Sequence, residues 1–172
     1  MLKLMKIIMI IMVVLLFVSC NKKVEVAKEF VTKNGLFYEK GKEIPYTGKS
    51  FKFFKSGKKR NEIFYKDGKM SGKATVWYEN GQRRGESSFV DGMLVGRNIT
   101  WYENGNKQSE YFYKNNKFDG KMAVWYKNGN KQSEAFMRNG KYEGKVIYWN
   151  EDGKKEKEEL YKDGKLINTI EF

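Results

Sequence analysis

Apolar and polar residues alternate along most of the chain from residue 35 onward, in segments of six to nine residues rich in aromatic and β-branched side chains. Alternation with a period of two residues is typical of β-strands. Dipeptides such as Asn80-Gly81 and Asp91-Gly92 separate the segments, and they favour tight hairpin turns because their residues accept positive φ angles. The pattern therefore predicts a succession of antiparallel β-hairpins.

The predicted hairpins repeat with a period of 24 residues, and three columns of residues keep this spacing. The columns are Gly48, Gly72, Gly96, Gly120 and Gly144; Phe53, Trp77, Trp101, Trp125 and Trp149; and Glu62, Glu86, Glu110, Glu134 and Glu158. Tandem hairpin units bury apolar surface against their neighbours, as the units of a solenoid do. We therefore expect an all-β fold, an elongated antiparallel meander of roughly ten strands stabilised by contacts between neighbouring units.

The repeat pattern also predicts the domain boundaries. Five full repeats begin at Gly48, and residues 35–41 and 167–172 are imperfect copies, which are expected as caps at the ends of a repeat array. The repeat domain therefore covers residues 35–172. Residues 20–34 carry no strong pattern, and we expect them to form a tether.

The first 19 residues have the pattern of a secretory signal peptide. Lys3 and Lys6 precede an uninterrupted apolar run from Ile7 to Val18. Twelve residues span about 18 Å as a helix, which is too short for a hydrocarbon core of about 30 Å. Residues 1–19 are therefore interpreted as a signal peptide and not as a permanent transmembrane helix.

The end of this segment, Phe17-Val18-Ser19-Cys20, resembles the lipobox of bacterial lipoproteins, although Phe17 stands where that family prefers Leu. The resemblance implies that Cys20 becomes the lipid-modified first residue of the mature chain. It also implies a membrane-anchored lipoprotein of the bacterial cell envelope, with the outer membrane or the cell surface favoured as its location. The alternative is an ordinary signal peptide with an incidental cysteine.

Composition argues against catalysis. The chain has no histidine, which is the usual general base and the commonest zinc ligand, and Cys20 is its one cysteine. A repeat array also presents identical residues at regular intervals, whereas catalysis needs unlike residues that converge. We therefore expect no enzyme activity, no cofactor, no metal site and no small-molecule substrate.

The chain is strongly basic, with a formal charge of +13, and only five of its 34 basic residues are Arg. Arg is preferred for bidentate recognition of bases and phosphates, whereas Lys acts as a hydrated point charge. We therefore expect no nucleic-acid partner. An anionic membrane surface or an acidic protein would suit this charge, and so would a simpler role of the lysines in keeping strand surfaces solvated.

Two columns are candidate binding residues. Trp77, Trp101, Trp125 and Trp149 could form an exposed stripe for a protein, a glycan or lipid headgroups, or they could pack on one another and hold the sheet together. The second interpretation is favoured. Each Glu of the acidic column is expected to pair with a lysine across the strands, for instance Lys73, Lys121 or Lys145, and binding of cations or of a basic toxin is the alternative.

The repeat unit G-x-x-x-x-W-Y-x-N-G-x-x-x-x-E-x-x-F-x-x-D-G, seen in 72–94 and 120–142, resembles the bacterial variant of the MORN repeat. This variant occurs in proteins described as YwqK-family antitoxins, and the resemblance covers roughly residues 35–172. It implies a β-hairpin repeat protein without known catalysis, acting as a scaffold that binds a protein or a membrane. An antitoxin or immunity protein that neutralises a partner toxin is the alternative function, and a structural spacer is a third.

Overall fold

The computed structural model describes residues 28–172, so the predicted signal peptide, Cys20 and the first part of the predicted tether lie outside the described residues. The described chain contains fourteen β-strands and no helix, and therefore no helix that could cross a membrane. The strands are β1 (Phe30–Lys33), β2 (Leu36–Glu39), β3 (Gly48–Phe53), β4 (Lys59–Lys66), β5 (Lys69–Trp77), β6 (Arg83–Val90), β7 (Met93–Trp101), β8 (Lys107–Lys114), β9 (Lys117–Trp125), β10 (Lys131–Arg138), β11 (Lys141–Tyr142), β12 (Gly144–Trp149), β13 (Lys155–Lys162) and β14 (Lys165–Glu171).

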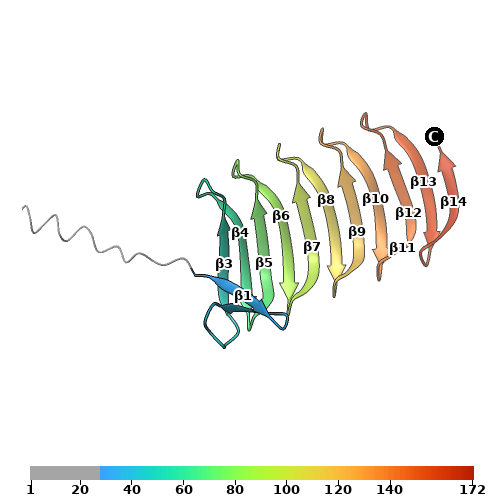
Figure 1. Ribbon diagram of the computed structural model, residues 1–172. Helices are drawn as coiled ribbons and strands as arrows, with labels where there is room; N and C mark the ends of the chain where they lie inside the picture. The colour runs from blue at the N-terminus through green and yellow to red at the C-terminus, as the bar shows by residue number, and fades with distance from the viewer. Residues whose placement is uncertain (1–27) are drawn as a thin grey trace, which may run out of the picture.

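Twelve of these strands form one sheet in which neighbours in the sequence are neighbours in space, from β3 at one edge to β14 at the other (Figure 1). All neighbouring strands are antiparallel, and β11 extends the pairing of β10 beside β12. The remaining strands, β1 and β2, pair only with each other. The predicted all-β meander of tandem hairpins is therefore confirmed.

The two kinds of turn in each unit have the geometry that their sequences predict. At one end of the sheet, Asp91 and Gly92 have φ angles of 51° and 80°, and Asn115 and Asn116 adopt the same conformation with 50° and 64°. Positive φ at both central residues is the mark of the hairpin turn that matches the twist of the strands. At the other end, the Asn80 side chain accepts a hydrogen bond from the Gln82 amide at 2.9 Å, which closes the turn around Gly81.

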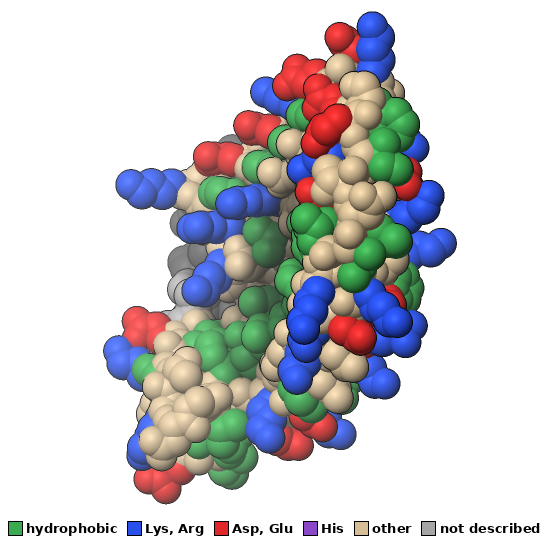
Figure 2. All heavy atoms as spheres, turned by 90° about the vertical axis from the view of Figure 1, so that its right-hand side faces the viewer, with side chains coloured by type: hydrophobic (Ala, Val, Ile, Leu, Met, Phe, Trp, Pro, Cys, Tyr) green, Lys and Arg blue, Asp and Glu red, His purple; other side chains and the backbone are tan. Residues whose placement is uncertain are grey.

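The glycines that open each repeat bend the strands. Gly72 has a φ of 68°, and the pairing of β4 with β5 shifts register between Ile63 and Tyr65, which is the local irregularity of a β-bulge. The same irregularity recurs from unit to unit, so the strands curve together (Figure 1). Seen from the β14 end, hydrophobic side chains gather in a hollow between two walls, with charged side chains around its rim (Figure 2).

Each unit is bonded to the next through the hairpin tips. The Tyr78 hydroxyl donates to the Trp101 carbonyl at 2.7 Å, and the Asn80 amide group donates to the Glu103 carbonyl at 3.1 Å. The following units repeat these bonds: Tyr102 to Trp125, Tyr126 to Trp149, Asn104 to Lys127 and Asn128 to Glu151. The Tyr-x-Asn-Gly motif therefore joins neighbouring units as well as shaping the turn within one unit.

The two faces of the sheet differ in packing. We call the face that carries the tryptophan column the Trp face. The Glu column lies on the same face: Glu86 pairs with Thr75, and Thr75 points to the same side as Trp77 because the two are two residues apart in one strand. The opposite face carries Ala74, Ala135, Met137 and Val146, all of which are buried. The ring contacts Tyr113–Phe118 and Tyr142–Tyr161 also lie there, with centroids 4.6 and 5.0 Å apart. Most of the apolar packing therefore occurs on the opposite face.

The N-terminal hairpin corrects the predicted tether, which was expected to cover residues 20–34. Phe30 to Lys33 form β1, and the Phe30 ring stacks on Phe37 with centroids 4.8 Å apart. Phe37 in turn stacks on Tyr65 at 4.0 Å, and its amide donates to the Gly68 carbonyl at 2.9 Å. Such contacts between residues distant in sequence leave no periodic pattern, so the tether prediction was wrong for this strand.

We predict that Tyr102→Phe lowers the free energy of unfolding by about 1 kcal/mol, because the substitution removes one half-buried hydrogen bond to the Trp125 carbonyl and keeps the ring. The measurement is urea unfolding followed by circular dichroism. Tyr111→Phe is the matched control, since no hydrogen bond of the Tyr111 hydroxyl occurs in residues 28–172, and we expect a change below about 0.5 kcal/mol. Equal effects of the two substitutions would contradict the proposed coupling between units.

Candidate binding face

The strands place the tryptophans in one line across the Trp face. Trp77, Trp101, Trp125 and Trp149 are the last residues of β5, β7, β9 and β12, immediately before the hairpin tips. All four side chains are half-buried. Because the tips are bonded to one another, each indole occupies an equivalent place in its unit.

Each indole lies beside a cation from the preceding strand. The distances from the cation to the ring centroid lie between 5.1 and 5.5 Å for Lys59 with Trp77, Arg83 with Trp101, Lys107 with Trp125 and Lys131 with Trp149. A cation at this range is attracted by the negative face of the ring. The Trp face is therefore a row of alternating cations and aromatic rings.

Phe172 provides a fifth aromatic position in this row, with Lys155 at 5.0 Å from its ring centroid. A strict 24-residue step from Trp149 would end at 173. The aromatic residue comes one position earlier in the sequence because the bend at β14 is one residue shorter. Glu158 pairs with Ile170, twelve residues later in the chain, whereas Glu134 pairs with Ile147, thirteen residues later. Asn168 replaces the glycine of the other units and does not adopt their positive φ angle.

The Glu column holds these cations in place. Glu110 accepts hydrogen bonds from Arg97 at 2.5 Å and from Lys107 at 2.7 Å. The other units contain the pairs Glu62 with Lys49 and Lys59, Glu86 with Lys73 and Arg83, Glu134 with Lys131, and Glu158 with Lys145 and Lys155. The hydrogen bond from Arg97 is the main cause that lowers the pKa of Glu110 to about 2. Bonds from Lys49 and Lys145, respectively, likewise lower the pKa of Glu62 and Glu158.

The structure answers two questions that the sequence left open. Within residues 28–172 no aromatic ring pair includes a tryptophan, so the favoured expectation that the tryptophans pack on one another was wrong. Lys and Arg side chains separate the indoles instead. The expected pairing of Glu with Lys across the strands occurs for Lys73 and Lys145, whereas the partner of Glu134 is Lys131 and not Lys121.

Sequence reasoning missed the cation beside each indole. The signal was present, because Lys59, Arg83, Lys107, Lys131 and Lys155 form a further column with the 24-residue step, three residues before each Glu. Lysine is so abundant in the chain that this column does not stand out. In addition, the bulge before each indole changes the register, so that alternation alone does not show which residues of neighbouring strands lie side by side. In the β5–β6 pairing the register shifts between Val76 and Trp77, which brings Arg83 opposite Trp77.

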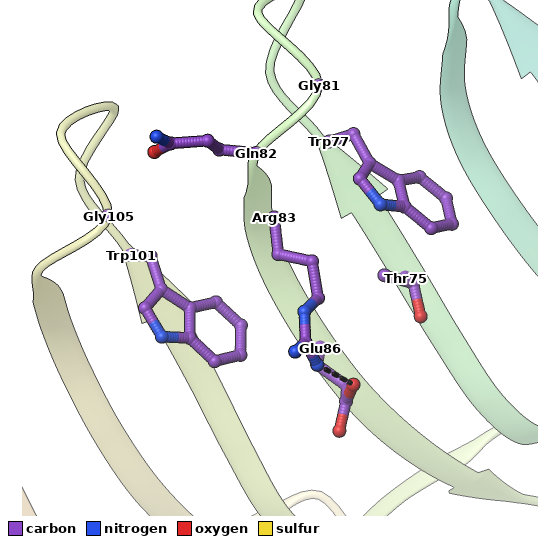
Figure 3. Close-up of a pocket in the computed structure, with 8 residues that line it drawn as sticks. All are labelled: Thr75, Trp77, Gly81, Gln82, Arg83, Glu86, Trp101 and Gly105. Carbon is purple, nitrogen blue, oxygen red and sulfur yellow. Dashed lines mark hydrogen bonds and ion pairs between the residues drawn. The ribbon is translucent and has the colours of Figure 1, made fainter.

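An open hollow of about 670 Å³ lies between two successive tryptophans (Figure 3). Trp77, Trp101, Arg83 and Glu86 line it, together with Thr75, Gln82 and the turn glycines Gly81 and Gly105. Figure 3 shows both indoles nearly face-on and in similar orientations, with Arg83 reaching down β6 between them toward Glu86. A second hollow of about 570 Å³ occupies the same face at Trp125, Glu134 and Ile147. The described residues contain no cluster of three or more potential metal-ligating Cys, Asp or Glu side chains.

We predict that Glu110→Gln lowers the free energy of unfolding by about 1 kcal/mol at pH 6, with the value reduced by the exposure of Arg97 and Lys107. The pKa of Glu110 is lower in the folded chain than its ordinary 4.5. Its contribution is therefore complete above pH 4.5 and disappears as the pH falls toward 2. Urea unfolding at a series of pH values should show the difference between wild type and variant closing over this window.

The remaining paired glutamates titrate alike in both proteins and cancel from this comparison. Glu103→Gln is the matched control, because the Glu103 side chain forms no ion pair among residues 28–172. A difference for Glu110→Gln that stays constant from pH 6 to pH 2 would contradict the prediction.

Comparison with known proteins supports the repeat assignment. The model of the MORN repeat variant family matches residues 46–67, 70–91, 94–115 and 142–163, four segments of 22 residues that together cover 88 of the 172 residues. The gap contains one further unit at 118–139, and its strands β9 and β10 pair as the strands of the matched units do. No curated protein matches the chain. The chain belongs to the MORN repeat variant family.

Proposed function

We propose that this protein is a non-enzymatic scaffold of the bacterial cell envelope that binds its partner through the Trp face. The observation that carries the proposal is the repetition of one indole, its neighbouring cation and one Glu in four successive units, all in one line on one side of the sheet. Repetition at constant spacing suits binding to an extended surface, and it lacks the convergence of unlike groups that a reaction needs.

The uneven packing of the two faces supports this assignment. The opposite face contains most of the buried side chains, whereas the Trp face leaves large apolar side chains exposed: Phe112 by 36%, Phe136 by 40% and Leu160 by 40%. Exposed apolar groups beside Trp and Arg are the composition of interaction hot spots. Scaffold binding therefore gives these exposed groups a role that the internal packing of the sheet does not provide.

The charge of the Trp face indicates an acidic partner. In each repeat one Glu of the column lies among two cations of this face, so these ten cations and five Glu together carry a net charge of +5. The cations are Lys49, Lys59, Lys73, Arg83, Arg97, Lys107, Lys121, Lys131, Lys145 and Lys155. Each Glu can neutralise only one of the two cations beside it. An anionic partner would neutralise the other.

Anchoring belongs to the same proposal. Removal of residues 1–19 and lipidation of Cys20 would attach the chain to a membrane, and the distance from Cys20 to the first strand at Phe30 leaves a short connecting segment. Several acyl chains on one cysteine give stable anchoring, because each buried methylene contributes about 0.8 kcal/mol. The scaffold would then act at the surface of the membrane that holds it.

We predict that the full chain, used as bait in a crosslinking pull-down from the source cells, enriches one protein or membrane fraction through the Trp face. The double variant Trp101→Ala, Trp125→Ala should lose that enrichment, because it removes two of the indoles. The control is Val31→Ala, Ile44→Ala, which removes exposed apolar side chains that lie outside the twelve-stranded sheet. Circular dichroism of each variant must show the wild-type sheet.

A partner that is toxic when expressed alone would establish the antitoxin function in place of the general scaffold. Equal recovery by bait, Trp variant and control would contradict binding through the Trp face.

We predict that Cys20→Ser abolishes the incorporation of a fatty-acid probe and moves the protein from the membrane fraction to the soluble fraction. The physical reason is that a serine hydroxyl cannot replace the thiolate as the nucleophile to which the lipid is attached. Metabolic labelling with an alkyne fatty acid, followed by fractionation, measures both effects. Ser19→Ala keeps Cys20 and serves as the control. Retention of label in Cys20→Ser would contradict lipidation at this residue.

A further inference from the structure

We infer that the Trp face binds a linear acidic polysaccharide, with one disaccharide on each repeat unit. The inference rests on the proposed function and names the ligand class of the same face. Four features carry it: the platform formed by the indoles, the polar groups around them, the spacing of the units and the charge on each unit.

The indoles form a platform for sugar rings. Figure 3 shows Trp77 and Trp101 lying nearly face-on over β5 and β7, in similar orientations, so that their planes are presented on the same side of the sheet. One face of a pyranose ring is a patch of C–H groups, which packs on the electron-rich face of an indole. Half-burial of the indoles holds their orientation, so stacking costs little side-chain entropy.

The groups around each indole suit the hydroxyls of a sugar. Gln82, Arg83 and Glu86 line the hollow between Trp77 and Trp101. Planar amide, guanidinium and carboxylate groups donate or accept paired hydrogen bonds, which fit the adjacent hydroxyls of a pyranose. The ion pair between Arg83 and Glu86, at 3.3 Å, aligns both groups along the floor of the hollow. The hollow is open, as it must be for a chain that enters and leaves each unit.

The spacing of the units fits a disaccharide. Successive indoles are separated by two strands, and strands lie about 4.8 Å apart, so the indoles repeat every 9 to 10 Å or so. A β-1,4-linked polysaccharide in its extended two-fold form presents the same ring face once per disaccharide, over a comparable length. The bonds from Tyr78, Tyr102 and Tyr126 to the next unit keep this spacing constant along the sheet.

The charge on each unit selects an acidic chain. One Glu faces two cations in each unit, and the side chains of Lys73 and Arg83 remain 62% and 59% exposed beside Glu86. One cation in each set of two cations and one Glu is therefore left in excess, and it would be neutralised by the one carboxylate or sulfate that each disaccharide of a two-fold chain turns toward the sheet. Uronate and sulfated chains share this chemistry, and the experiment distinguishes them.

The size of the site follows from the aromatic row. Five positions, from Trp77 to Phe172, carry a ring beside a cation. Because each strand is rotated by roughly 20° to 25° from its neighbour, a bound chain must follow the twist of the sheet. Affinity should therefore rise with the length of the oligosaccharide and become constant at about five disaccharides.

The experiment is isothermal titration of the full chain, purified in detergent, with β-1,4-linked mannuronate oligomers of two to twelve sugars. Sulfated cello-oligosaccharides of the same lengths form the second arm, and neutral cello-oligosaccharides form the third. Dextran sulfate and vesicles of phosphatidylglycerol test binding by charge alone and binding of a membrane. The variants are Trp101→Ala, Arg83→Gln and Arg84→Gln.

Arg84 provides a matched control, because it follows Arg83 in β6 but its guanidinium lies 5.7 Å from the Tyr78 ring centroid and lines a hollow on the opposite face. We expect Trp101→Ala and Arg83→Gln each to weaken the acidic β-1,4-linked arms by about three- to tenfold, and Arg84→Gln to leave them unchanged. Neutral oligomers should bind more weakly than either kind of acidic oligomer, and Trp101→Ala should weaken their binding by the same factor. The stronger acidic arm identifies the preferred anionic group.

Three results would overturn the inference: equal binding of dextran sulfate and the β-1,4-linked oligomers, equal effects of Arg83→Gln and Arg84→Gln, or binding to the vesicles alone. None of them would affect the proposed scaffold function, because the crosslinking pull-down tests that function through capture of a partner that depends on Trp101 and Trp125. Failure of the pull-down together with titrations that depend on Trp101 would instead identify the polysaccharide itself as the partner.

Discussion

Three hydrogen bonds set the geometry on which the rest of the sheet depends: the hydroxyls of Tyr78, Tyr102 and Tyr126 each donate to the carbonyl of the tryptophan one unit further on. Pairing within the sheet already fixes the distance between strands, but it leaves the hairpin tips free to splay apart. Bonds such as that of Tyr78 to Trp101 tie the tips together with a constant offset. A side chain presented beside one tip is therefore presented in the same way beside the next.

A single-layer sheet has no second layer against which to pack. One of its faces must therefore provide most of the apolar packing, while the other is free to remain accessible. The bulges at the glycine column curve the strands, and the small side chains of Ala74 and Ala135 are buried together with larger apolar groups on the opposite face. The Trp face is held instead by cations between rings and by glutamates between cations. This arrangement keeps the face polar enough for water while leaving aromatic surface accessible, and that combination is suited to reversible binding.

The fold was predictable from the sequence because each unit carries complete local signals. Alternation gave the strands, and Asp91-Gly92 and its equivalents gave the turns, with positive φ angles as expected. The surroundings of the tryptophans were not predictable, because the register shift before Trp77 depends on a bulge that alternation cannot reveal. The hairpin of β1 and β2 also escaped prediction, since it is held by contacts of Phe37 with Tyr65 and Gly68, which lie about thirty residues away along the chain.

The last copy shows which part of the unit is essential to the Trp face. β14 has no glycine at its bend, the segment from Glu158 to its partner Ile170 is one residue shorter than that from Glu134 to Ile147, and all residues of β14 are exposed. Phe172 nevertheless occupies the aromatic position beside Lys155, as Trp149 does beside Lys131. The altered register brings a ring to the cation even where the glycine and the tryptophan are both replaced. The pairing of ring and cation is therefore the most persistent feature of the face, and it is the feature that a ligand with the same repeat would recognise.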